Sequence, residues 1–223
     1  MNNAQFYIQL AIGSILISNF VLAKFLGLCP FLGVTKRSSD SVGMGLAVIF
    51  VMTLASAVTA LLYRHVLLPT SPDHTNILQA LGLPLPEGGL VMVLKTTSYI
   101  LVIAALVQFV EMVLRKSVPG LYRALGIYLP LITTNCAVMG VALLNTTDWK
   151  LSAGAPAIHV AAFSGFCGGV GFLLAMVLMS GIRERLAETR VPKALQGLPI
   201  AVISAGLMAL AFLGFTKLFG IAV

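Results

Sequence analysis

The sequence predicts an all-α integral membrane protein of six transmembrane helices, formed by two inverted three-helix repeats in which helices one and four are interrupted. Three observations predict this fold. Hydrophobic residues make up 59% of the 223 residues and charged residues only 9%, against roughly 25% charged in a soluble domain. The apolar residues gather in runs of about 20, the length of a membrane-spanning helix. The second half of the chain also repeats features of the first half in the same order.

The composition excludes several classes of protein. A mean hydropathy of +1.02 leaves too few polar side chains to cover the surface of a soluble monomer. Six spans leave no room for a soluble domain, so we expect residues 1–223 to form a single membrane domain without a complete active site of its own. The net charge of +7 does not indicate nucleic-acid binding, because the basic residues are scattered through short loops.

The six spans are expected to be helices, because a helix satisfies its own backbone hydrogen bonds in lipid. The first is not expected to be a cleaved signal peptide, since no basic residue precedes Lys24. The connection at residues 68–95 is the only long one, and its prolines and its Gly88-Gly89 pair predict an irregular loop. The spans run approximately over residues 5–25, 42–63, 97–114, 122–144, 156–182 and 199–219.

The basic residues of the connections predict the orientation. Nine of them follow spans one, three and five, and four lie in the other connections. The positive-inside rule places the larger set in the cytoplasm and both termini on the outer side. The nine are Lys36, Arg37, Arg115, Lys116, Arg123, Arg183, Arg185, Arg190 and Lys193, and the four are Arg64, Lys95, Lys150 and Lys217.

The internal repeat has a unit of three spans. The sequence Cys-x-x-x-Gly lies at the end of span one and again in span four. An odd number of spans per unit inverts the second copy in the membrane, so repeat one covers about residues 1–118 and repeat two about residues 119–223. Helix breaks at corresponding places point to a site near the midplane, although ordinary kinks packed by small residues are the alternative. The expected breaks lie at Pro30 with Gly27 and Gly33, and at Pro130 with Thr133, Thr134 and Asn135.

Two cysteines, Cys29 and Cys136, fall at these breaks. A buried thiol can be a small hydrophobic residue, but N–H groups at a helix interruption stabilise thiolates and bond to cluster sulfurs. An iron–sulfur cluster normally requires four thiolates, so two would have to come from a second copy or from a paralogue. A disulfide is an alternative, and zinc is disfavoured because His65, His74 and His159 lack ligand spacing. The third cysteine, Cys167, is expected to pack among glycines.

Other polar residues of the spans have two interpretations each. Glu111, with Gln108 one turn before it, is either a functional intramembrane carboxylate or the ion-pair partner of Arg115. Lys24 either compensates a negative cluster or extends to the membrane interface. Four residues either bond to freed carbonyls or line an ion path: Asn19, Asn135, Thr133 and Thr134.

Two long segments resemble a known family. NFVLAKFLGLCPF at residues 19–31 and LGIYLPLITTNCA at residues 125–137 are similar to segments of the A subunits of Rnf complexes. The sibling E subunit of the sodium-translocating NADH:quinone reductase has similar segments. The resemblance also takes in Arg183-Glu184-Arg185 and residues 205–208, and so covers nearly the whole chain. The loop at residues 68–95 looks expanded relative to the family.

The resemblance implies a six-helix subunit of a complex in the bacterial inner membrane, with both termini in the periplasm. Such a complex passes electrons between ferredoxin and NAD and couples this transfer to cation movement. The resemblance further implies a paralogous partner of inverted orientation, the Rnf E type. Cys29 and Cys136 would share one 2Fe-2S cluster with that partner. Small residues near the breaks, Gly27, Gly33 and Gly140, are expected to permit its close approach.

The sequence is therefore compatible with two functions. The first is an electron-transfer subunit in which Cys29 and Cys136 ligate a shared cluster. The second is a secondary transporter or channel subunit with an ion site at the broken helices. The cysteines favour the first function, because a transporter needs no soft ligand at both breaks.

Overall fold

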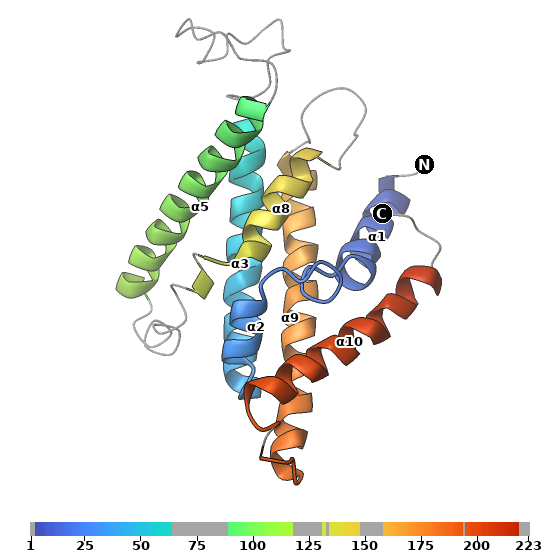
Figure 1. The fold of residues 1–223 in the computed structure, drawn as a ribbon. Helices are drawn as coiled ribbons and strands as arrows, with labels where there is room; N and C mark the ends of the chain where they lie inside the picture. The colour runs from blue at the N-terminus through green and yellow to red at the C-terminus, as the bar shows by residue number, and fades with distance from the viewer. Residues whose placement is uncertain are drawn as a thin grey trace, which may run out of the picture.

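The computed structural model describes residues 3–63, 89–117, 131–132, 134–147, 158–193 and 195–218. Every regular element within these ranges is a helix, so the all-α prediction is confirmed for the described part of the chain (Figure 1). The elements are α1 (Asn3–Ile12), the π-helical turn η1 (Gly13–Ile17), α2 (Leu28–Val34), α3 (Ser38–Leu62), α5 (Gly89–Ser117), α8 (Cys136–Thr147), α9 (Ile158–Glu188) and α10 (Leu198–Leu218).

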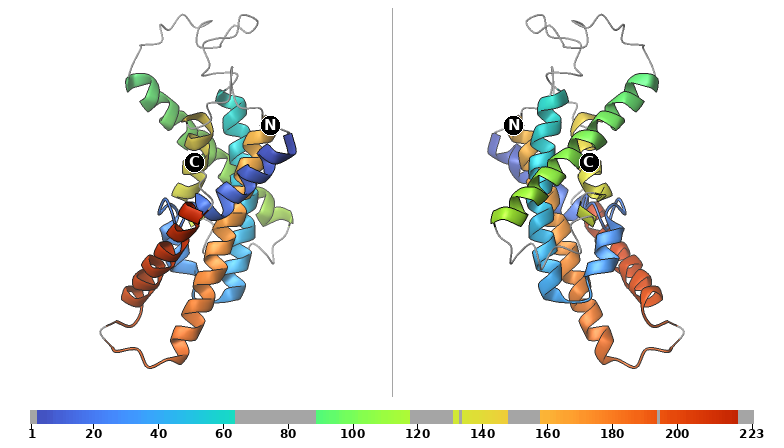
Figure 2. Two further views of the ribbon diagram at one scale, coloured as in Figure 1. Left: turned by 90° about the vertical axis from the view of Figure 1, so that its right-hand side faces the viewer. Right: turned by 90° about the vertical axis from the view of Figure 1, so that its left-hand side faces the viewer.

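The centre of the molecule is the antiparallel pair α3 and α9, which lie side by side along their lengths (Figures 1 and 2). Both are long and apolar enough to cross a membrane. Helix α5 flanks this pair on one side and α10 on the other. Shorter apolar stretches in the described residues are Gln5–Ile17, Thr96–Met112, Cys136–Asn145 and Leu198–Gly214.

Glycines of α9 let the central helices approach closely. A Cβ added at Gly169 would lie 2.7 Å from the Cα of Ile49, and one at Gly165 would lie 2.7 Å from the carbonyl oxygen of Met52. These two glycines are four residues apart, the small-xxx-small spacing that allows backbones to touch in membranes. On another face of α9, a Cβ at Gly168 would lie 2.8 Å from the ring of Phe20. Glycines of α9 therefore allow this helix to pack closely against both α3 and the first span.

A larger residue at this contact is expected to destabilise the protein. Gly169→Leu should lower the free energy of unfolding by about 1–3 kcal/mol, because α3 presents backbone there and overpacking cannot be relieved by a rotamer change. Gly181→Leu is the matched control, since nothing lies within 4 Å of a Cβ at that position of α9. Thermal unfolding of the two purified variants measures the difference. Equal melting of both variants would contradict the close packing.

Several helix boundaries differ from those expected. Helix α5 begins at Gly89, so the end of the predicted loop at residues 68–95 is helical, because its apolar run continues the span after the Gly-Gly pair. Helix α9 extends to Glu188, beyond its apolar run, because Arg, Glu, Leu and Ala of residues 183–188 are strong helix formers. Helix α8 extends to Thr147, and its Asn145 is buried and donates to the hydroxyl of Ser56. The rest of the loop, the start of span four and residues 148–157 lie outside the described residues.

The first span is interrupted earlier than Pro30. Its helix ends at Ile17, and residues 18–27 form a compact irregular segment before α2. Asn19 holds the start of this segment, because its side-chain oxygen accepts the N–H groups of Val21 and Leu22 at 3.0 and 3.3 Å. Its amide nitrogen donates to the carbonyl of Gly171 at 2.8 Å. Asn19 therefore bonds to the freed backbone of the break, as the first of its two interpretations predicted.

Pro30 and Gly33 do not break the helix. Both lie inside α2, where Pro30 is the third residue. The first N–H groups of a helix have no intrahelical partner, so a proline in the first turn leaves no hydrogen bond unmade. The residue that ends the irregular segment is instead Gly27, whose φ is +80°.

Candidate functional site

Two short helices start from the middle of the bundle and run in opposite directions. Helix α2 leads from the irregular segment toward one end of the molecule, and α8 leads from Cys136 toward the other end (Figures 1 and 2). Before α8, residues 131–132 are helical, whereas Thr134 and Asn135 are not. The predicted break near Asn135 is thus present in the described residues, while Pro130 and Thr133 lie outside them.

A hydrogen bond joins the two breaks. The backbone N–H of Gly27 donates to the sulfur of Cys136, with 3.3 Å between nitrogen and sulfur. Cys29 follows Gly27 by two residues, so its Cα lies within about 7.6 Å of that of Gly27. The fold therefore brings the two predicted site residues, 107 positions apart in sequence, into one region.

Both the backbone conformation and the lack of space at position 27 require glycine. Its φ of +80° is one that L side chains rarely adopt. A Cβ at this position would also lie 2.7 Å from the ring of Phe172 and 2.9 Å from Oδ1 of Asn135. The close approach that lets the Gly27 N–H reach the Cys136 sulfur thus depends on glycine.

Asn135 fixes the start of α8. Its Oδ1 accepts the N–H of Ala137 at 3.0 Å, which is the bond of an N-cap residue. The residue is 3% exposed. Among the described residues, its Nδ2 has no hydrogen-bond partner, which is uncommon for a buried amide. A buried donor is thus placed one residue before Cys136.

The three cysteines lie in different surroundings. Cys29 and Cys136 are exposed, and both lie in the first turn of a helix, α2 or α8. N–H groups at a helix start donate hydrogen bonds to cluster sulfurs. Cys167 is 3% exposed within α9, between the glycines that face α3 and the first span. Its packing is the one expected from the sequence.

The exposed pair does not form a complete metal site within the described part of the chain. No three His, Cys, Asp or Glu side chains in that part come close enough together to hold a metal ion. His159 is exposed at the start of α9, and His65 and His74 lie outside the described residues. Within the described residues, the two thiols at the breaks are Cys29 and Cys136.

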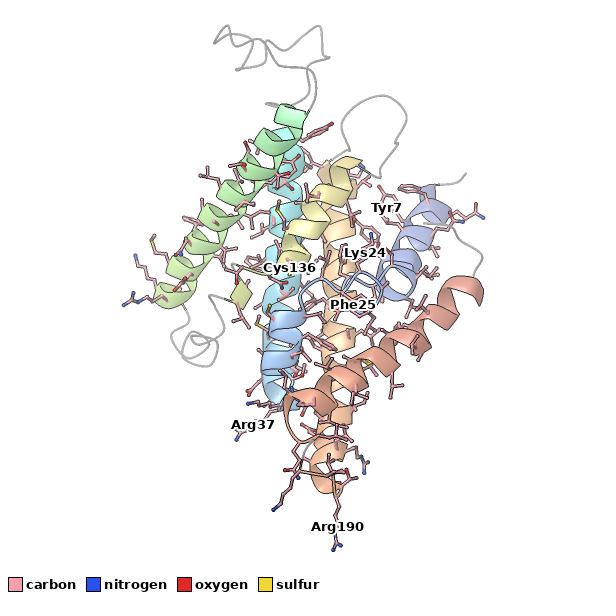
Figure 3. The ribbon with its side chains drawn as sticks, viewed as in Figure 1. Tyr7, Lys24, Phe25, Arg37, Cys136 and Arg190 are labelled. Carbon is pink, nitrogen blue, oxygen red and sulfur yellow. The ribbon has the colours of Figure 1, made fainter. Side chains whose placement is uncertain are left out.

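The other polar residues that the sequence analysis singled out differ in their surroundings. Lys24 is exposed beside the breaks, with its ammonium 5.6 Å from the ring centroid of Phe20 (Figure 3). Glu111 is half-buried on α5, and the expected ion pair with Arg115 is not formed between these two described side chains. Thr134 is exposed at the turn before Asn135.

Arg183 has a role that sequence reasoning missed. Its guanidinium donates to the carbonyl of Leu32 at 2.8 Å and to the hydroxyl of Thr35 at 3.1 Å, at the carboxyl end of α2. A cation there satisfies free carbonyls and complements the helix dipole. In the sequence, Arg183 is one of several basic residues near the end of a span, and no local signal distinguishes it. It anchors α2, and with it Cys29, to α9.

The basic residues labelled in Figure 3, Arg37 and Arg190, lie at the same end of the bundle. Arg37 precedes α3, and Arg190 follows α9. Nearby, the carboxylate of Glu184 accepts the N–H of Ser38 at 2.9 Å. Both arginines belong to the set that the sequence predicts on the cytoplasmic side.

Comparison with known proteins places this site in context. Residues 7–219 match the family model described as Rnf-Nqr subunit, membrane protein. The chain is 51% identical over 209 residues to the A subunit of the Na(+)-translocating ferredoxin:NAD(+) oxidoreductase complex of Acetobacterium woodii, covering 94% of this chain and 96% of that protein. It is 49% identical over 212 residues to the A subunit of the ion-translocating oxidoreductase complex of Azoarcus sp., covering 95% and 97%.

Proposed function

The chain belongs to the Rnf-Nqr family of membrane subunits, and on this basis we propose that it is the A subunit of an ion-translocating oxidoreductase complex in a bacterial inner membrane. Relatives that bear this name match almost their whole length to this chain. The protein acts within a multi-subunit complex of electron transport. The chemistry that this chain contributes depends on the two cysteines at its breaks.

We propose that Cys29 and Cys136 hold a 2Fe-2S cluster. The single observation that carries this proposal is the contact between the Gly27 N–H and the Cys136 sulfur, which unites the two breaks around exposed thiols. Sulfur that accepts backbone N–H bonds and lies at helix starts is suited to ligate iron as thiolate. When bound, the cluster supplies one-electron transfer at this depth of the bundle. Gly27, Asn135 and Arg183 position the two thiols.

The cluster is shared with a second chain. Four thiolates are normally required, and two are offered here, both exposed. The proposed partner is the paralogous subunit of Rnf E type, inverted in the membrane, with two cysteines of its own. Of the three glycines expected at that interface, Gly140 packs instead against Leu26 of the same chain, and Gly27 is buried. Gly33 is exposed and remains available to the partner.

Iron analysis of the purified protein tests the proposal. We expect no stoichiometric iron or acid-labile sulfide in the chain expressed without its paralogue, because it supplies half of the ligands. Co-expression with the paralogue should yield roughly two irons per pair, as one cluster held by four thiolates contains. Stoichiometric iron in the monodisperse lone chain would refute the shared cluster, and an iron-free pair would refute the cluster itself.

We further propose that the chain consists of two inverted three-helix repeats. The opposite directions of α2 and α8, and the antiparallel pairing of α3 with α9, support this arrangement. Under it, α5 of repeat one corresponds to α10 of repeat two, which flanks the opposite side of the central pair. The six-span topology follows from two such units.

The orientation that goes with this topology is testable by reporter fusions. We expect fusions near Arg37, Lys116 and Arg185 to report a cytoplasmic location, because nine of the thirteen assigned basic residues follow spans one, three and five. A fusion after Val223 should report the periplasm. A cytoplasmic carboxyl terminus would overturn the assignment.

A further inference from the structure

The backbone at Phe25 is held in a conformation that its side chain does not explain. Its φ is +55°, and it is the one non-glycine residue with positive φ among the described residues. A bulky L residue is strained in this region, because its Cβ crowds the backbone. Such strain persists only where the surroundings enforce it, and it is found preferentially at functional sites.

Packing within the chain explains why the backbone turns at position 25, but it does not explain why the residue there is phenylalanine. The next residue, Leu26, donates its N–H to the carbonyl of Phe20 at 2.8 Å and packs against Gly140. This path requires positive φ at position 25, for which glycine or asparagine is suited. Phe25 is 56% exposed, so more than half of its surface gains no packing within the chain.

Phe25 lies close to the contact that joins the two breaks. It precedes Gly27 by two residues, so its Cα lies within about 7.6 Å of the residue that bonds to the Cys136 sulfur. Figure 3 shows Phe25, Lys24 and Cys136 at the same level of the bundle, around its middle. Cys29 and Cys136 are exposed there as well. An exposed aromatic residue thus lies two positions from the residue that bonds to the Cys136 sulfur.

We propose that Phe25 is an anchor residue that inserts into the paralogous subunit when the two chains assemble around the cluster. This inference rests on the proposed function. Aromatic residues, Phe among them, are enriched in the buried cores of protein interfaces, and a phenyl ring adds apolar contact that excludes water from the cluster. Contact with lipid alone does not explain a phenylalanine at this strained position, because a phenyl ring can face lipid equally well from an unstrained backbone.

The association of the separately purified chain with its paralogue in lipid vesicles measures this role. Phe25→Ala and Phe25→Gly should each raise the dissociation constant about 30-fold, the effect typical of removing an anchor. Phe25→Gly also relieves the positive φ, so this variant without its paralogue should melt no lower than the wild-type protein. The matched control is Phe50→Ala on α3, because Phe50 is 55% exposed and lies outside the breaks.

The outcomes separate this inference from the proposed function. Wild-type affinity in either Phe25 variant, or an equal loss in Phe50→Ala, would overturn the anchor while leaving the cluster intact. An iron-free pair after co-expression would overturn the cluster, and the comparison of Phe25 with Phe50 in vesicles would still decide the anchor. Failure of the wild-type chains to associate would overturn both.

A second measurement uses the complex in its native membrane. A photo-crosslinking phenylalanine analogue at position 25 should crosslink to the paralogue, whereas the same analogue at position 50 should not. Crosslinks from position 25 to lipid alone, or to a different protein of the complex, would overturn the assignment of the partner.

Discussion

Replacing either Cys29 or Cys136 with serine is expected to remove the cluster from the purified pair almost completely. Serine presents a neutral hydroxyl in place of a thiolate, and iron in a cluster of this type is held by soft sulfur ligands. Both cysteines lie at helix starts on the exposed face of the breaks. Iron content, acid-labile sulfide and visible absorption of the co-purified pair measure the loss, and electron transfer through the complex should be lost with them.

Cys167→Ser is the matched control for these variants. Cys167 is buried within α9, so its replacement should leave the iron content and the absorption spectrum largely intact. A variant of Cys167 that loses the cluster while Cys136→Ser keeps it would show that the ligands have been wrongly chosen.

Replacing Gly27 with alanine is expected to be the most damaging change that leaves all cysteines in place. Alanine at positive φ costs about 1–2 kcal/mol, and its Cβ would lie within 3 Å of both Phe172 and Asn135. Relief of these contacts would move the Gly27 N–H away from the Cys136 sulfur. We expect the pair to lose most of its iron and to associate more weakly.

Two glycine controls separate the causes of this effect. Gly197→Ala tests strain alone, because Gly197 has a φ of +91° but nothing lies within 4 Å of an added Cβ. Gly206→Ala tests an uncrowded glycine of a helix, because nothing lies within 4 Å of an added Cβ at that position of α10. Both variants should retain their iron. Loss of iron in Gly197→Ala to the same degree as in Gly27→Ala would mean that the contact with Cys136 is not the cause.

The two helix breaks could be predicted from the sequence, because Gly27 and Asn135 are local signals of a broken helix, and the two cysteines lie beside them. The start of the first break could not be located, since Ser18 and Asn19 are followed at once by a further apolar run. Only the hydrogen bonds of Asn19 to the backbone mark that point in the fold. Pro30 was misleading because a proline is tolerated equally well in a first turn.

The contacts that unite the site could not be predicted, because they join residues distant in sequence. No short sequence pattern indicates the bond from Gly27 to Cys136 or the bonds from Arg183 to the end of α2. The glycines of α9 do have one, since four-residue spacing indicates close packing. What the spacing did not reveal is that α3 and the first span use different glycines of the same helix.

The central claim is that one cluster lies between this chain and its paralogue, and electron paramagnetic resonance of the reduced protein tests it most directly. The account predicts about one unpaired spin per co-purified pair, as one cluster held by four thiolates requires, and no such signal from either chain without the other. A signal of equal intensity per chain in the separated protein would contradict the shared cluster.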